Sequence, residues 1–545
     1  MAENWYQEAV FYELYLRAFQ DGNGDGHGDF RGAIERLDYV HSLGVDVIWI
    51  LPMYPSPLKD DGYDVADYYN IHPDYGTLDD FKAFLDAAHE RGLRVVTDLV
   101  MNHTSDQHPW FQEARRNPDS LYHDYYVWSE TGEEYSEARI IFLDYEPSNW
   151  TYDEVAGKYF WHRFYSSQPD LNYDNPAVHE EMFNIIRFWL DLGVDGFRAD
   201  AVPYLYEREG TNCENLPETH RFLKKVRTMM NEEYPDRVLI AEANQWPEDV
   251  CLYFGDGDEF HMCFHFPIMP RLYMAIRQHD KTPIVDILQR TPPIPANAQW
   301  LTFLRNHDEL TLEMVTVEER QWMWEQYAPD PRMRLNLGIR RRLAPLLDGD
   351  RRRWLVLHAM LLSLPGTPII YYGDEIGMGD NVWLPDRHGV RTPMQWDDGE
   401  NGGFSSAPQT YVPVIDDELY GYRKVNVGAQ EDDPDSYLWA TRFLLQARAQ
   451  SPALQRGSME WFNTDSRAIL GYWRTLDEQR VLCLFNVANQ RHSASLELAD
   501  FAGWQLVDLL HEGREWTIDQ WPVVLNLEPF GAHWLRLEAP EQDLP

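Results

Sequence analysis

The sequence predicts an α/β protein: a (β/α)8 TIM barrel with a lobe inserted after the third strand and an antiparallel β-sandwich domain at the C-terminus. Three observations lead to this prediction. Short apolar runs alternate eight times with amphipathic helical segments, which is typical of a barrel of parallel strands covered by helices. One interval between consecutive runs is too long for a simple connection. Beyond residue 455 the pattern changes to short alternating strands.

Eight runs rich in β-branched and aromatic residues are the predicted barrel strands. The segments between them, such as DDFKAFLDAAHERG and HEEMFNIIRFWLDLG, carry apolar residues at helical spacing and end in glycine, which stops a helix. In chain order the strand runs are VFYELYL near residue 10, VDVIWILPM from Val45, LRVVTDLV from Leu93, VDGFRADAV from Val194, VLIAEAN from Val238, FHMCFHF from Phe260, WLTFLRN from Trp300 and PIIYYGDE from Pro368.

The chain divides into three predicted parts. Residues 1–103 and 172–454 form the barrel, residues 104–171 form the inserted lobe over its mouth, and residues 455–545 form the C-terminal β-domain. The inserted stretch is rich in Trp, Tyr, His and turn residues. Residues 309–352 form a second, irregular expansion, which we interpret as a further flap.

Composition limits the partners and the compartment. The formal charge of -43, from 90 acidic against 47 basic residues, disfavours nucleic acids and anionic membranes and leaves a neutral small molecule as the better partner. Four cysteines without a CxxC pair predict neither disulfides nor structural zinc. The N-terminus lacks a signal-peptide pattern and no apolar run reaches a membrane span of about 20 residues, so we expect a cytoplasmic protein. The sequence leaves the oligomeric state, monomer or homo-oligomer, open.

Polar side chains follow the apolar strands at the points where the strands end. Because barrel enzymes place their chemistry at the carboxyl ends of the strands, these side chains are the candidates for a site. They are Asp60, Tyr63 and Asp64 after the second strand, Asp98, Asn102 and His103 after the third, Arg198 and Asp200 on the fourth, Glu242 after the fifth, and His307 and Asp308 after the seventh.

Several of these segments together carry a family resemblance. DLVMNH, GFRADAV, the glutamate after the fifth strand and RNHDE, with QPDLN at residues 168–172, resemble the sequence regions of the α-amylase family of glycoside hydrolases and occur in the same order. The resemblance covers essentially the whole chain. It implies a barrel that splits a glycosidic bond with retention of configuration, which requires two carboxyl groups about 5–5.5 Å apart, one ionised and one protonated.

The resemblance implies catalytic roles for three acids. Asp200 would be the nucleophile, held ionised by Arg198 on the same strand face. Glu242, on the adjacent strand, would protonate the departing oxygen and later activate the incoming hydroxyl. Asp308 would hold sugar hydroxyls and favour the distorted, oxocarbenium-like ring. Asp98 is expected to organise the top of the barrel and not to contact the substrate.

Further side chains are implied to bind the sugar. Tyr63 would stack on the glucose ring, and His103 and His307 would donate hydrogen bonds to its hydroxyls. Asp60 and Arg391 would form a pair that closes the pocket, so that only short substrates fit. The full set of substrate-binding candidates is Asp60, Tyr63, His103, Gln168, Arg198, His307 and Arg391.

A glycine-spaced acidic loop, DGNGDGHGD at residues 21–29, offers oxygen ligands for a metal. Its spacing follows the first part of an EF-hand loop, but position twelve is Gly32, so the bidentate glutamate is absent. It resembles instead a structural Ca2+ loop of the oligoglucosidase-like branch, with Mg2+ as a weak substitute; the alternative is an Asx-rich turn without metal. No organic cofactor is expected. The ligands would be Asp21, Asn23, Asp25, the carbonyl of His27, and Asp29.

Long stretches at residues 201–220, 261–277, 303–315 and 335–353 narrow the resemblance. They resemble the branch of the family that interconverts maltose and trehalose by intramolecular glucosyl transfer inside a closed pocket, with some hydrolysis to glucose. The inserted lobe and the flap are the candidates for a lid that excludes water. Two alternatives stay open: an α-glucosidase or oligo-1,6-glucosidase that transfers glucose to water, and a catalytically inactive sugar-binding or transporter-chaperone module.

Overall fold

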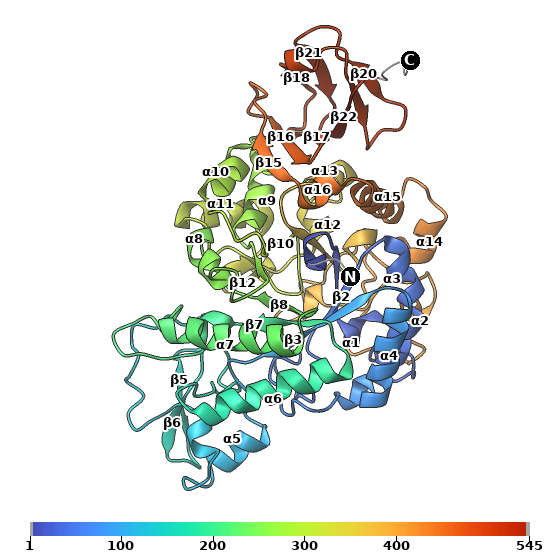
Figure 1. Ribbon diagram of the computed structural model, residues 1–545. Helices are drawn as coiled ribbons and strands as arrows, with labels where there is room; N and C mark the ends of the chain where they lie inside the picture. Colours follow the sequence, from blue (N-terminus) through green and yellow to red (C-terminus); the bar gives the residue numbers. More distant parts are fainter. Residues whose placement is uncertain (1–3, 541–545) are drawn as a thin grey trace.

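The structure, a computed structural model, describes residues 4–540 and contains a closed barrel of eight parallel strands (Figure 1). Around the barrel the strands follow the order β1-β14-β10-β9-β8-β7-β3-β2. The eight predicted runs form these strands, so the predicted fold class is confirmed. Their bounds are β1 Phe11–Leu14, β2 Val47–Ile50, β3 Arg94–Val100, β7 Gly196–Asp200, β8 Val238–Ala241, β9 Met262–Phe264, β10 Gln299–Phe303 and β14 Thr367–Tyr371.

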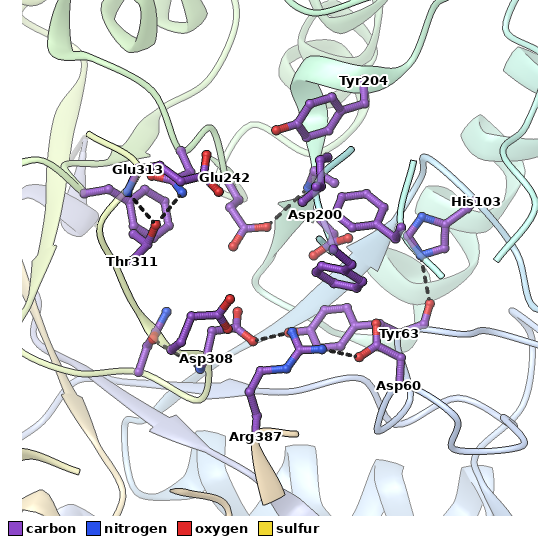
Figure 2. Close-up of a pocket in the computed structure, with 18 residues that line it drawn as sticks. Asp60, Tyr63, His103, Asp200, Tyr204, Glu242, Asp308, Thr311, Glu313 and Arg387 are labelled. Atoms are coloured by element: carbon purple, nitrogen blue, oxygen red, sulfur yellow. Dashed lines mark hydrogen bonds and ion pairs between the residues drawn. The ribbon is translucent and has the colours of Figure 1, made fainter. Parts of the chain in front are cut away.

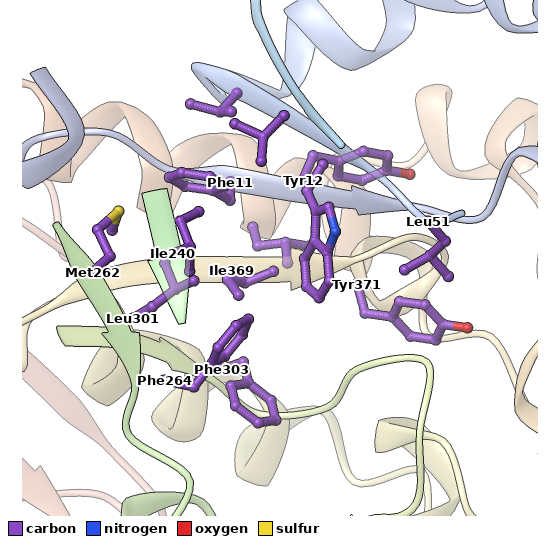
Figure 3. Packing of buried hydrophobic residues seen from close by; sticks show 14 of the residues in the cluster. Phe11, Tyr12, Leu51, Ile240, Met262, Phe264, Leu301, Phe303, Ile369 and Tyr371 are labelled. Carbon is purple, nitrogen blue, oxygen red and sulfur yellow. The ribbon is translucent and has the colours of Figure 1, made fainter. Parts of the chain in front are cut away.

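The inside of the barrel is a packed core and not a pore. Phe11, Ile240, Met262, Leu301 and Ile369 lie together there, one from each of five strands (Figure 3), and each is at most 1% exposed. Burying a side chain of this size stabilises the fold by about 1.5–3 kcal/mol. The packed strands therefore form a rigid base, and the polar residues at their carboxyl ends are held on it in fixed positions.

The helices begin and end where the sequence supplies caps. α4 (Leu78–Glu90) starts with a capping box, and α6 (Pro176–Leu192) starts at the Asn175 cap and ends at Gly193 in the left-handed conformation. The other helices are α1 Leu16–Phe19, α2 Phe30–Glu35, α3 Leu37–Leu43, α5 Pro109–Ala114, α7 Pro217–Glu233, α8 Pro247–Val250, α9 Ile268–Gln278, α10 Thr282–Arg290, α11 Val317–Tyr327, α12 Leu343–Leu346, α13 Arg351–Leu361, α14 Val427–Glu431, α15 Tyr437–Ala449 and α16 Pro452–Arg456.

Two additions follow the carboxyl ends of barrel strands. The lobe after β3 contains α5 and the antiparallel sheet β4-β6-β5, and a bridge between His103 and Asp170 ties its base to the barrel. The flap after β10 contains α11, α12 and the small sheet β11-β13-β12, so it is more regular than the sequence indicated. The strand bounds are β4 Trp128–Ser129, β5 Trp150–Asp153, β6 Lys158–Trp161, β11 Leu310–Thr311, β12 Arg334–Leu335 and β13 Gly338–Ile339.

The C-terminal β-domain packs its own core between a six-stranded and a two-stranded sheet. It also contacts the barrel directly, because the Tyr472 hydroxyl lies 2.7 Å from Ser363 Oγ and the buried Arg474 donates to the Ser363 carbonyl, in the link between α13 and β14. Among residues 4–540, no helix is both long enough and apolar enough to cross a membrane. The strands are β15 Ser458–Trp461, β16 Ile469–Leu476, β17 Gln479–Asn486, β18 His492–Leu496, β19 Gln505–Asp508, β20 Glu515–Thr517, β21 Val523–Leu527 and β22 Ala532–Glu538.

Candidate active site

The strand ends, the lobe and the flap line one shared pocket (Figure 2). Six predicted site residues lie in its wall: Asp60, Tyr63, His103, Asp200, Glu242 and Asp308. The lobe adds apolar side chains, namely Ile141, Phe142 and Phe164, and the flap adds polar ones, namely Glu309, Thr311 and Glu313. The pocket therefore has acids at its centre and flat or apolar faces beside them, which suits a neutral ligand rich in hydroxyl groups.

Two carboxyl groups meet at the centre of this pocket. Asp200 is the last residue of β7, and Glu242 directly follows β8, the neighbouring strand. Arg198 Nη1 lies 2.6 Å from Asp200 Oδ1, the Nη2 of the same guanidinium contacts Glu242, and Glu242 Oε2 accepts the backbone N–H of Ala201, the residue after Asp200, at 3.3 Å. Inverting glycosidases keep their acids about 6.5–9.5 Å apart to admit a water. A pair this close favours the retaining route, in which one carboxylate attacks directly.

Burial and local charge separate the protonation states of the three acids. Burial raises the pKa of Asp200 to about 6 against the opposing effect of Arg198, and it raises the pKa of Glu242 to about 8, with Asp200 adding to the rise. Burial alone would also raise the pKa of Asp308, but His307 and the guanidinium groups of Arg387, Arg391 and Arg198 outweigh it and hold that pKa below its usual range. At neutral pH the site therefore holds an ionised Asp200 beside a protonated Glu242.

Asp98 lies below this pair and does not line the pocket. It is fully buried, accepts from Arg198 Nη1 at 2.5 Å and accepts from the Trp49 indole nitrogen at 2.8 Å. These contacts fix the guanidinium that in turn reaches both catalytic candidates. Asp98 thus orients Arg198 from inside the barrel.

The structure corrects the predicted pair of Asp60 with Arg391. Asp60 Oδ1 lies 2.8 Å from Arg387 Nη2, whereas Arg391 contacts Asp61 at 2.6 Å and Asp308 at 2.9 Å and is only 1% exposed. The physical reason is local, since Asp61 has a φ of 46°. This left-handed turn lets the two adjacent carboxylates serve two different arginines. Arg387 also lies 3.1 Å from Asp308, so it and not Arg391 closes this end of the pocket.

The remaining predicted sugar contacts divide into two layers. His103 lines the pocket, and its Nε2 lies 3.2 Å from the Tyr63 carbonyl oxygen. His307 is fully buried behind Tyr63, with the two rings 8° from parallel and the Tyr63 hydroxyl 2.8 Å from His307 Nε2. Gln168 is also fully buried and donates to Asp60 Oδ2 at 2.9 Å. The predicted donation by His307 to a sugar is therefore not available in this structure, because both of its ring nitrogens have protein partners.

The lobe and the flap touch each other across the pocket. Arg139 of the lobe lies 2.7 Å from Glu313 of the flap and 2.8 Å from Glu214, in the segment between β7 and α7. A second contact joins the Asp144 carboxylate to the Asn336 backbone N–H at 2.8 Å. Three separate segments of chain thus meet at Arg139, beside Glu313 in the wall of the pocket.

The predicted metal loop lies beside the barrel, away from the catalytic pair. Asp21 and Asp29 are 7% and 2% exposed, and each accepts the Asn23 backbone N–H at 3.1 Å, so two buried carboxylates face each other. Asp25 is more exposed, and the three carboxylates do not converge as a set within 4.8 Å. All four oxygens of Asp21 and Asp29 already accept a backbone N–H of the loop or the Ser405 hydroxyl. A divalent cation would share these oxygens with the loop, with Asn23 and the His27 carbonyl as neutral oxygen donors.

Two protein-family models match the chain. One, described as "Alpha amylase, catalytic domain", matches residues 13–457, and the other, "Maltogenic Amylase, C-terminal domain", matches residues 459–534. The chain belongs to the α-amylase family. The predicted family membership is therefore confirmed, and the boundary between the two matches coincides with the passage from barrel to C-terminal β-domain.

Relatives of this α-amylase family member include enzymes named for disaccharide synthesis. Trehalose synthase/amylase TreS of Mycobacterium tuberculosis is 56% identical over 99% of this chain and 92% of that protein, and the trehalose synthase of Pimelobacter sp. is 53% identical over 98% and 96%. The oligo-1,6-glucosidase of Parageobacillus thermoglucosidasius is 32% identical over 99% and 100%. The crystal structure of the trehalulose synthase MutB from Pseudomonas mesoacidophila MX-45 superposes with a TM-score of 0.80 at 28% identity, covering 99% and 100%.

Three residues in or near the pocket of this α-amylase family member were missed in the sequence. Arg387 lies four positions before the predicted Arg391, in the same loop, so the loop was identified but the residue was not. Arg139 lies in the inserted lobe, where no spacing distinguishes it from other surface arginines. Glu13, a single charge in the apolar run VFYELYL, carried a signal that was not used, because a lone acid in a buried strand needs a partner.

Proposed function

We propose that this chain interconverts maltose and trehalose by retaining, intramolecular glucosyl transfer, with some hydrolysis to glucose as a side reaction. The observation that carries the proposal is the Asp200 and Glu242 pair, which shares Arg198 inside a pocket that Arg387 closes at one end. A closed end admits one hexose beyond the catalytic pair, so the substrate is a short α-glucoside. The 53–56% identity to trehalose synthases, against 32% to an oligo-1,6-glucosidase, supports the choice of disaccharide.

The reaction proceeds in two displacements. The Asp200 carboxylate attacks the anomeric carbon of the non-reducing glucose of maltose, while the Glu242 carboxyl donates its proton to the glycosidic oxygen as that bond breaks. The released glucose turns within the pocket. Its anomeric hydroxyl then attacks the glucosyl-Asp200 ester, and Glu242 takes the proton of that hydroxyl. Two inversions leave the transferred carbon with its original configuration and form the α,α-1,1 bond of trehalose.

The other pocket residues hold the transferred glucose. Tyr63 presents the face of its ring to the sugar, and His103 presents the polar edge of its imidazole. Asp308 presents a carboxylate that stays ionised and accepts hydrogen bonds from sugar hydroxyls. Asp60 and Arg387 close the far end, where they would bind the hydroxyl groups most distant from the broken bond. In this arrangement the ionised Asp308 also stabilises the positive charge that develops on the ring in the transition state.

Water is the competing acceptor, and it distinguishes the proposed isomerase from an α-glucosidase. The same three acids would serve both reactions, so the product depends on how long the pocket stays closed. The contact of Arg139 with Glu313 and Glu214 holds the lobe and the flap over the intermediate. This closure favours return of the released glucose over attack by solvent.

We also propose that the loop at residues 21–29 binds a structural Ca2+, for which Mg2+ substitutes weakly. The facing carboxylates of Asp21 and Asp29 support this assignment, since a cation between them would relieve their repulsion. A cytoplasmic location is proposed as well, and the four cysteines without a disulfide support a reducing compartment.

Incubation of the purified protein with maltose tests the proposed reaction. Trehalose should exceed glucose among the products by NMR, and added 13C-labelled glucose should not enter the trehalose, because the transfer is intramolecular. A 5-fluoroglucosyl fluoride should label Asp200, as read by mass spectrometry of its peptide. Asp200→Asn should abolish both products. Glucose without trehalose would establish the α-glucosidase instead, and neither product would favour the sugar-binding module.

A further inference from the structure

Glu13 is a fully buried acid that lies behind the pocket and does not line it. It is on β1, and one of its oxygens, Oε1, meets two nitrogens of the same residue: it accepts the His307 backbone N–H at 3.1 Å and lies 2.5 Å from His307 Nδ1. The other oxygen has no hydrogen-bond partner among the described residues. A single carboxyl oxygen thus fixes both the backbone and the ring of His307.

We propose that Glu13 is a positioning residue of the glucosyl-transfer site, which fixes the tautomer and the orientation of His307 and through it the Tyr63 ring. The inference rests on the proposed function and adds a residue to it. The tautomer follows from the geometry. Both ring nitrogens face a carboxyl oxygen: Nδ1 lies 2.5 Å from Glu13 Oε1, and Nε2 lies 3.2 Å from Asp308 Oδ2. Because the contact with Glu13 is much the shorter one, and Glu13 Oε1 already accepts the backbone N–H, we place the hydrogen of the neutral imidazole on Nδ1.

The tautomer determines what the opposite ring nitrogen does. With its hydrogen on Nδ1, a neutral His307 offers Nε2 as an acceptor, and the Tyr63 hydroxyl, 2.8 Å away, donates to it. The Tyr63 oxygen can then accept from Arg198 Nη1 at 3.4 Å. A series of hydrogen bonds thus runs from the guanidinium that holds Asp200 and Glu242, through Tyr63 and His307, to the carboxyl group of Glu13.

This series of hydrogen bonds fixes the orientation of Tyr63, which forms part of the pocket wall beside the proposed sugar position. Tyr63 lines the pocket, and within residues 4–540 its hydroxyl contacts His307, Arg198 and Asp98. Without Glu13 the imidazole could exchange its hydrogen to Nε2 or rotate, and the Tyr63 hydroxyl would lose its nearer acceptor and keep the longer contact with Asp98 Oδ1, at 3.4 Å. A displacement of about 1 Å in a reacting group costs on the order of 100-fold in rate. Loss of Glu13 is therefore expected to lower kcat more than it raises KM.

The same fold contains a matched control, Glu375. This glutamate is also fully buried, its Oε1 accepts two hydrogen bonds, from Tyr12 at 2.9 Å and Tyr39 at 2.8 Å, and its Oε2 likewise has no partner among the described residues. It contacts neither the pocket nor His307. Replacement of Glu375 therefore reproduces the loss of a buried carboxyl group without the proposed link to the site.

The kinetic test compares Glu13→Met and Glu13→Gln with Glu375→Met. Glutamine keeps an acceptor oxygen at the same place, and methionine does not. We expect Glu13→Met to lower kcat for consumption of maltose, summed over trehalose and glucose, by about 10- to 100-fold with KM changed less than about threefold. Glu13→Gln should recover most of that loss, and Glu375→Met should match the wild type per folded molecule. Equal kcat in Glu13→Met and the wild type would overturn the inference.

A second measurement needs no substrate and stands if Glu13→Met does not fold. 15N-histidine labelling of the wild-type chain, with the His307 signals assigned by their absence in His307→Gln, reports which ring nitrogen carries the hydrogen. We expect Nδ1 to be protonated in the wild type and in Glu13→Gln. Protonation of Nε2 alone in the wild type would overturn the inference. A wild type that makes glucose but no trehalose would contradict the proposed function and leave this result unaffected.

Discussion

The protonation states of Asp200 and Glu242 predict how the enzyme responds to pH. Catalysis requires Asp200 ionised and Glu242 protonated, and burial sets their pKa values at about 6 and about 8. Activity is therefore lost as the pH falls through about 6, because Asp200 gains a proton, and as it rises through about 8, because Glu242 loses one. The profile of kcat/KM should be a bell with its maximum near pH ~7.

The size of the effect follows from the same two pKa values. At pH ~5 about a tenth of Asp200 is ionised, and at pH ~9 about a tenth of Glu242 is protonated, so kcat/KM should fall about tenfold at each end. Because the two groups interact, the limbs belong to the pair and not to either residue alone. Trehalose formation from maltose, measured in buffers of constant ionic strength, gives the profile.

A variant assigns the alkaline limb to its residue. Glu242→Gln cannot donate a proton, but an aryl α-glucoside with an acidic phenol leaves without one, so the burst of phenol should persist and lose its dependence on high pH. The acid limb should remain, since Asp200 is unchanged. An alkaline limb that survives in Glu242→Gln, or a wild-type profile that is flat down to pH ~4, would refute the reasoning.

Three further changes test the pocket, the lid and the metal loop. Arg387→Leu should raise KM for maltose by about 10- to 100-fold, because Asp60 loses its buried partner. The control Arg423→Leu removes an exposed ion pair and should leave KM unchanged. An unchanged KM in Arg387→Leu would contradict the assignment of the closed end of the pocket. Arg139→Met should raise the ratio of glucose to trehalose several-fold by freeing the lobe from the flap, measured by NMR of the products, and an unchanged ratio would count against the lid. Chelation by EGTA should lower the melting temperature of the wild type by several degrees, and added Ca2+ should restore it. Asp21→Asn keeps an oxygen acceptor but loses a charge, so its melting temperature should change less on chelation. Equal changes in the variant and the wild type would argue against this loop as the calcium site.

The barrel could be predicted from the sequence because its strands are buried on both faces. A run such as VDVIWILPM has no polar alternation, and β2 in its centre is buried throughout. The flap could not be predicted in the same way. Its sheet is built of two-residue strands, β11, β12 and β13, which are too short to leave a periodic pattern.

The candidate site was predictable where a residue belongs to a strand end and unpredictable where it depends on a distant partner. Asp200 and Glu242 follow directly from their places on adjacent strands. The partner of Asp60 depends on a left-handed turn at Asp61 and on which of two loop arginines reaches it, and neither is encoded in local spacing. The bond of Glu13 to His307 joins residues 294 positions apart.

The contact of Tyr472 and Arg474 with Ser363 has a consequence for how the molecule melts. A loop of the barrel is hydrogen-bonded to the first long hairpin of the C-terminal β-domain through Tyr472 and Arg474, and both of these side chains are buried at the junction. Cutting the chain near residue 457 would leave unpaired polar groups and bare apolar surface on both fragments. The two units should thus behave as one cooperative block, with a single calorimetric peak in place of two.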